Sequence, residues 1–310
     1  MNTLTEAVHD YVGMRQSLGF KLVQVEGWLK DFATFMDTHG KTWVTTELAL
    51  QWAVQPVGGR PDTWAKRLTA VRGFARYRSA TDARCEIPES GLLANRQRRA
   101  KPYLYSENEI SNLLAAACAL KSDSGLRGQT YYCLFGLLSV AGLRISEALA
   151  LQRHDVNLQQ GLLTIRGTKF GKSRLVPLHE STRGILAQYA RRRDAAFDHT
   201  VAANFLLSER GETLSTSTVR RTFRQLSVQI GLRGPKDRSG PRLHDYRHRF
   251  ATETLLRWYR SGEDIERRLP ALSTFMGHSR TSDTYWYISA CPELMGEAAR
   301  RLEQRWERST

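Results

Sequence analysis

The sequence predicts a mainly α protein with a small β-sheet, in which a helical N-terminal domain precedes a mixed α/β domain. The chain has 310 residues, and a single hydrophobic core usually stops growing near ~250 to 300 residues, so two domains are expected. Apolar residues recur at three- and four-residue steps in the N-terminal part, which is typical of helices. The stretch 162–178 instead contains two short strand-like segments, LLTIRG and RLVPL, joined by the turn TKFGKS.

The N-terminal domain is predicted to span residues 1–95 and to contain four helices. The second of these carries Leu22, Val25 and Leu29 at helical spacing. Gly19 and Gly40 end the first two helices, because glycine is the common residue just past a helix C-terminus. A proline-containing stretch then separates the third helix from the fourth.

The fourth helix is predicted over residues 63–79 and is strongly basic. A basic helix can face the phosphates of a nucleic acid, although a solvated charged face is an equally good local interpretation. The candidates for DNA contact in this helix are Lys66, Arg67, Arg72 and Arg76.

A basic linker, residues 96–104, is predicted between the domains because the helical pattern breaks there into NRQRRAKP. Lys101 in this linker is a further DNA-binding candidate. Ser106 and Glu109 form a capping box, so the second domain is predicted to span 105–310. Beyond the strands this domain is helical. Its last helix, 292–308, is amphipathic, and docking on a neighbouring subunit and docking on its own chain both remain open.

The charge of the chain favours a polyanionic partner. Lys and Arg total 46 against 31 Asp and Glu, a formal charge of +15 with a pI near 10.0. The longest apolar stretch, 131–143, is too short for a membrane span of ~20 residues, and no signal peptide is visible. The four cysteines are far apart and form no CxxC pair, so neither a zinc site nor a disulfide framework is expected. These features predict a cytoplasmic, nucleoid-associated protein without metal or cofactor.

Several polar residues in the second domain can together attack a phosphodiester. Tyr287 is a nucleophile candidate, but a phenol with a reference pKa of ~10 needs cationic neighbours and a proton acceptor. Arg144 and Arg247 can bind the non-bridging phosphate oxygens and the charge of the transition state. His244, three residues before Arg247, can accept or return the phenolic proton. The leaving 5′ oxygen needs an acid, for which Lys169 on the hairpin tip is the candidate. Lys172 is its nearest competitor and is also a candidate for binding the DNA backbone.

Five segments in order, AGLRISEALAL, GTKFGKSRLVPL, LHDYRH, MGHS and a tyrosine nine residues after the histidine of MGHS, resemble the catalytic boxes of the tyrosine recombinase family, the phage integrase and Xer-like enzymes. The match covers roughly residues 105–290, and the N-terminal domain resembles the family's core-binding domain. The resemblance implies a clamp on double-stranded DNA, a 3′-phosphotyrosyl intermediate, and strand exchange within a homotetramer on two DNA sites, alone or with related recombinases.

The resemblance also implies individual roles. Arg144 and Arg247 would form the phosphate clamp, Lys169 the general acid and His244 the acid/base. The remaining three are a supporting hydrogen-bond donor, the nucleophile and a residue that supports the clamp: His278, Tyr287 and Glu147.

Some choices stay open in the sequence. Tyr285 lies only two residues from Tyr287, and only the spacing from His278 favours the latter. Pro270 is expected to interrupt the helix before the MGHS segment. His248 is interpreted as a structural or surface residue. The sequence favours a mobile-element enzyme for integration, excision or transposition. The alternatives are a type IB topoisomerase, a non-catalytic DNA-binding regulator and a metal-dependent transposase, for which no convincing carboxylate cluster is visible.

Overall fold

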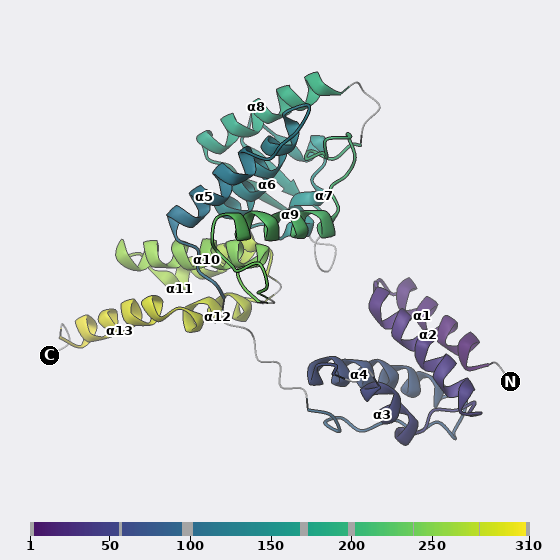
Figure 1. The fold of residues 1–310 in the computed structure, drawn as a ribbon. Helices are drawn as coiled ribbons and strands as arrows, with labels where there is room; N and C mark the ends of the chain where they lie inside the picture. Colours follow the sequence, from purple (N-terminus) through teal and green to yellow (C-terminus); the bar gives the residue numbers. More distant parts are fainter. Residues whose placement is uncertain are drawn as a thin grey trace. The chain divides into compact units, whose positions relative to one another are not determined.

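The computed structural model describes residues 3–55, 58–94, 102–167, 173–197, 202–237, 239–278 and 280–307. The chain divides into two compact units, Met1–Ala100 and Lys101–Thr310, and this division falls inside the predicted linker. Figure 1 draws the helices of each unit, and each unit has a hydrophobic core of its own. The predicted fold class, mainly α with a small β-sheet, is confirmed.

The first unit contains four helices in its described part. Thr3 and Glu6 form a capping box that starts the first helix. The fourth helix begins two residues earlier than predicted because Pro61 occupies its first turn, where a missing N–H costs nothing. Phe32 and Trp52 are fully buried and pack edge to face in the core. The four helices are α1 (Leu4–Ser17), α2 (Val23–Thr38), α3 (Thr46–Val54) and α4 (Pro61–Arg78).

The second unit surrounds a short antiparallel sheet with helices. The central pair is in register with Leu163 opposite Val176, and both side chains are fully buried. A third strand of two residues was not predicted, since so short a segment carries no periodicity. The strands are β1 (Val156–Asn157), β2 (Leu162–Ile165) and β3 (Arg174–Pro177), and a 3₁₀ turn, Arg153–Asp155, precedes them. The helices around the main core are α5 (Glu107–Cys118), α6 (Leu126–Ala141), α7 (Ile145–Ala150), α8 (Glu180–Ala196) and α9 (Thr216–Gln229).

The C-terminal helices form a second cluster of buried residues in this unit. They are α10 (Leu243–Arg260), α11 (Ile265–Met276), α12 (Ser282–Ala290) and α13 (Pro292–Glu307). The prediction that Pro270 interrupts a helix is wrong, because α11 runs through it. The proline removes one backbone donor, but buried Leu269 and Leu272 hold both sides of that turn in the core.

Helix α13 packs against α10 of its own chain. The Arg301 guanidinium donates to the carbonyl oxygens of Trp258, Tyr259 and Glu263 at 2.8–3.1 Å, and Leu294 is fully buried. In this structure the last helix therefore docks within its own subunit. None of the described helices is both long enough and apolar enough to cross a membrane.

Candidate active site

The C-terminal turn of α11 gathers three arginines. Its last carbonyl oxygens, those of Phe275, Met276 and Gly277, accept hydrogen bonds from Arg174 (2.7 Å), Arg247 (2.5 Å) and Arg144 (3.1 Å), respectively. Carbonyls at a helix C-terminus lack intrahelical partners and form the negative end of the helix dipole, so they attract cations. The α11 terminus thus fixes three guanidinium groups side by side.

Gly277 makes this arrangement possible. Its φ of +66° lies in the left-handed region, where a side chain is strained. A Cβ atom there would lie 2.6 Å from Nη1 of Arg174. The glycine of the MGHS segment therefore permits both the turn and the close approach of the arginine.

Arg247 is the most deeply buried of the site cations, with 1% of its surface exposed. Its second anchor is the carbonyl oxygen of Gly142, 2.7 Å from Nη1. Burial lowers the pKa of Arg247 to about 10, and the charge of Arg144 acts in the same direction. The group stays cationic at neutral pH, and its two carbonyl contacts use only two of five N–H donors.

Arg144 is the N-cap residue of α7, so it lies at a helix start. Its Nη1 lies 2.7 Å from Oε1 of Glu147, whose other carboxylate oxygen accepts from the Arg144 backbone N–H at 3.0 Å. This backbone amide is therefore already satisfied by Glu147. About a third of the Arg144 side chain, 31%, is exposed, which leaves the guanidinium accessible to an incoming anion.

Glu147 is shared between two arginines. Arg174 donates to its two carboxylate oxygens at 3.1 and 2.8 Å, in the bidentate geometry that makes such pairs strong. Burial alone would raise the pKa of Glu147, but the hydrogen bonds from Arg174 and Arg144 outweigh it and lower the pKa to about 2. The carboxylate is therefore ionised at neutral pH.

Arg174 was missed in the sequence. It opens β3, directly after the predicted hairpin turn, and its side chain is only 8% exposed. The signal that could have found it is an arginine at the start of a predicted core strand, which needs a buried anion such as Glu147.

The two predicted site histidines differ in environment. His278 keeps Nδ1 2.7 Å from the Thr284 hydroxyl, and burial, followed by the charges of Arg247 and Arg144, lowers its pKa to about 4. His244 lies on the exposed side of α10. Partial desolvation by neighbouring groups lowers the pKa of His244, and the positive charge of Arg247 lowers it further. Because the residue is exposed, the desolvation is limited. Both imidazoles are neutral at pH 7 and can accept a proton.

The structure separates the two candidate tyrosines. Tyr287 is 4% exposed, whereas Tyr285 is 52% exposed on the other side of α12. The Tyr287 ring stacks on that of His278 with centroids 5.9 Å apart. Burial raises the pKa of Tyr287, while the charge and hydrogen bonding of Arg247 oppose this effect. Of the two, Tyr287 lies beside the arginine cluster.

The structure also brings His248 into this group, although its sequence context predicts only a structural or surface residue. Its ring contacts those of His244, Trp286 and Tyr287, at centroid distances of 4.7, 5.0 and 5.4 Å. A helical spacing of four residues from His244 was the signal available in the sequence.

Lys169, Lys172 and Lys101 lie outside the described residues. In α4 the expectation for Arg67 is wrong: it is 8% exposed, its guanidinium lies 3.7 Å over the Trp52 ring, and it donates to the Trp52 carbonyl oxygen. Arg72 holds the carbonyl oxygens of Pro88 and Glu89. The exposed cations of this helix are Lys66, which pairs with Asp62 at 3.4 Å, and Arg76.

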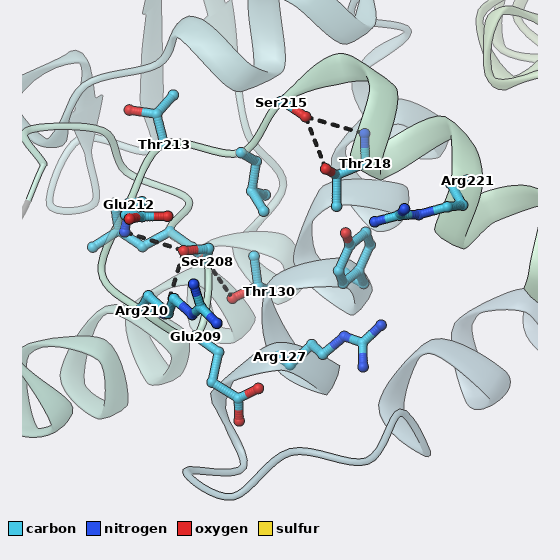
Figure 2. A pocket seen from close by; sticks show the side chains of 13 residues that line it. Arg127, Thr130, Ser208, Glu209, Arg210, Glu212, Thr213, Ser215, Thr218 and Arg221 are labelled. Carbon is cyan, nitrogen blue, oxygen red and sulfur yellow. Dashed lines mark hydrogen bonds between the residues drawn. The ribbon is translucent and has the colours of Figure 1, made fainter.

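A second basic feature is a hollow of about 570 Å³ between the start of α6, the loop 207–215 and α9. Arg127 and Arg221 extend into the same space, and the Ser215 hydroxyl caps α9 beside it (Figure 2). Arg210 and two acidic residues complete its charged lining. The hollow adds to the cationic surface of the second unit.

Across the described part of the chain, no group of three or more His, Cys, Asp or Glu side chains is arranged to hold a metal ion. The site itself consists of guanidinium groups, neutral imidazoles and a phenol that lie together. This set is able to bind an anionic phosphorus centre and attack it.

Comparison with known proteins agrees with this geometry. Residues 104–293 match the phage integrase family. The y4rB protein of Sinorhizobium fredii, named as an integrase/recombinase, is 52% identical over the full length of both chains. Tyrosine recombinase XerD of Caulobacter vibrioides is 31% identical, covering 77% of this chain and 75% of its own.

Solved structures show the same fold. The Tn1549 transposon integrase, solved in complex with transposon right end DNA, superimposes with a TM-score of 0.68 at 17% identity, covering 96% of this chain and 98% of that one. XerH site-specific recombinase bound to its palindromic difH substrate gives 0.61 at 19% identity, covering 89% and 78%. By its family match and its full-length relative, the chain belongs to the phage integrase family of tyrosine recombinases.

Proposed function

We propose that this protein is a site-specific DNA recombinase that cleaves and rejoins double-stranded DNA through a 3′-phosphotyrosyl intermediate, without a metal. The observation that carries the proposal is the juxtaposition of a buried tyrosine, Tyr287, with the arginines anchored at the α11 terminus. The relatives and structural neighbours named as integrases and recombinases support the same activity.

In the proposed reaction the Tyr287 oxygen attacks the scissile phosphorus, the phosphotyrosyl bond forms and the bond to the DNA 5′ oxygen breaks. Arg144 and Arg247 bind the non-bridging oxygens through their remaining N–H donors and stabilise the added negative charge. Glu147, though not in contact with DNA, fixes the Arg144 fork. Attack by the 5′ hydroxyl of a second strand then reverses the step and completes the exchange.

The proposed reaction needs one group to accept the proton of the nucleophile and another to protonate the leaving oxygen. Tyr287 is protonated in the DNA-free protein because burial raises its pKa, so its proton must pass to a base as the new bond forms. The neutral imidazole of His244 is the proposed acceptor, and His278 donates a supporting hydrogen bond to the phosphate. Lys169 is proposed as the acid that protonates the leaving 5′ oxygen.

DNA contact is proposed for the exposed cations of α4, Lys66 and Arg76, with Lys101 and Lys172 beyond the described residues. A homotetramer on two DNA sites, alone or with related recombinases, is the proposed assembly. The relation to proteins named as integrases favours integration, excision or transposition of a mobile element, within the cytoplasm and at the nucleoid.

The activity can be tested before the target sequence is identified. Duplexes tiled across the DNA flanking the gene, each with a nick near one candidate position, would release a short 5′-hydroxyl fragment on cleavage and trap the covalent protein–DNA complex. A complex that survives denaturing electrophoresis, forms in excess chelator and occurs at a defined sequence is expected. Efficient relaxation of supercoiled plasmid without that sequence would instead indicate a topoisomerase.

A further inference from the structure

His248 is a buried titratable residue for which the proposed reaction has no use. It is 7% exposed and follows Arg247 directly on α10. Its Nδ1 atom is buried and has no hydrogen-bond partner among the described residues. A buried polar atom without a partner is unfavourable, and native proteins contain few of them.

The surroundings of this atom are aromatic. The His248 ring lies between His244 of its own helix and the adjacent Trp286 and Tyr287 of α12. A phenylalanine or leucine would supply such packing without leaving a nitrogen unsatisfied. The imidazole therefore needs an explanation beyond filling space.

The charged and titratable groups that act on His248 leave it neutral. Burial comes first, then His244, with Arg242 and Arg247 acting in the same direction and Asp245 opposing them; together they lower its pKa to about 4. A neutral imidazole has one nitrogen with a lone pair and one with a proton. The unpartnered Nδ1 can thus serve as a hydrogen-bond acceptor, with the proton on Nε2.

We propose that His248 is a positioning residue for DNA cleavage, whose Nδ1 accepts a hydrogen bond from the indole N–H of Trp286 on α12 when the adjacent Tyr287 turns toward the scissile phosphate. In the DNA-free protein this acceptor is unsatisfied by the described residues, which makes the resting position of α12 less favourable than the engaged one. The inference rests on the proposed role of Tyr287. It adds a device by which α10, which carries Arg247 and His244, orients the nucleophile.

The test compares three replacements by single-turnover formation of the covalent complex on the trapped duplex. His248→Phe keeps a ring without nitrogen, His248→Asn keeps a polar atom near the Nδ1 position, and His248→Leu keeps neither. We expect a fall in cleavage rate of about tenfold or more for Phe and Leu, a rate for Asn at least threefold above both, and DNA affinity within twofold of wild type. His154→Asn, a replacement at an exposed histidine of the same unit, should change nothing.

Equal rates for His248→Asn and His248→Leu, or a wild-type rate for His248→Phe, would overturn the proposal and leave His248 as a packing residue. Thermal unfolding of each variant accompanies the kinetics. If His248→Phe does not fold, the Asn-to-Leu ratio alone decides. Failure of the proposed function is distinguished by Tyr287→Phe, because a covalent complex in that variant removes Tyr287 as nucleophile whatever His248 does.

Discussion

Replacing Glu147 by glutamine should destabilise the second unit in a pH-dependent way. Glu147 contacts both Arg144 and Arg174 through its carboxylate, and it is 9% exposed. Its pKa falls from 4.5 to about 2 on folding, which at ~1.4 kcal/mol per pH unit corresponds to about 3 kcal/mol of stabilisation. Loss of one partner from a buried ion pair costs a similar ~3–5 kcal/mol.

The sign follows from the direction of the shift. The folded-state pKa is depressed, so the stabilisation is fully present above the unfolded value of 4.5 and is lost as pH falls toward 2. Wild type and Glu147→Gln should differ by about 3 kcal/mol in free energy of unfolding at pH 7 and by clearly less at pH 3. Urea unfolding measures this difference in the free energy of unfolding. Hydrogen exchange of the buried α6 amides reports on the second unit separately. Glu180→Gln, at an exposed carboxylate, is the control. A difference below 1 kcal/mol at pH 7, or one that grows on acidification, would refute the reasoning.

Three further outcomes are expected. Gly277→Ala should lower the free energy of unfolding by about 1–2 kcal/mol because of the left-handed backbone. The new methyl group should push Arg174 off Glu147 and so slow cleavage more than it weakens DNA binding. Unchanged cleavage kinetics would contradict the arrangement. In binding titrations, Arg76→Ala should reduce the slope of log K against log salt by ~0.9. In calorimetry, Arg67→Ala should instead lower the thermal stability of the first unit. The reverse pattern would indicate that Arg67 contacts DNA. Excess EDTA should leave the single-turnover cleavage rate unchanged, and a loss restored by Mg²⁺ would revive the metal-dependent alternative.

Much of the fold could be predicted from local patterns. The capping box at Ser106 and Glu109 starts α5 as expected, and the two short strand-like segments joined by a turn form the β2–β3 pair. The path of α11 through Pro270 could not be predicted, because burial of Leu269 and Leu272 compensates for a missing backbone hydrogen bond only in the folded state. The burial of Arg67 is similar: a helical wheel cannot show that Trp52, from another helix, covers its guanidinium.

Only part of the candidate site could be predicted from the sequence, because some of its residues are defined by contacts between distant segments. Short segments of the sequence indicate the chemistry of four site residues, namely Arg144, Arg247, His278 and Tyr287. Arg174 and His248 contact elements far along the chain, namely α11 and α12. Their local signals, an arginine that opens a strand and a four-residue spacing from His244, therefore do not by themselves place them in the site. The choice between Tyr285 and Tyr287 also depended on which side of α12 faces the core.

The measurement that tests the central claim most directly is covalent trapping with the two tyrosine variants. On the trapped duplex, wild type and Tyr285→Phe should form a covalent complex, and Tyr287→Phe should form none while still binding DNA. Proteolysis and mass spectrometry of the wild-type complex should place the nucleotide on Tyr287. A covalent complex in Tyr287→Phe, or a nucleotide on Tyr285, would contradict the account.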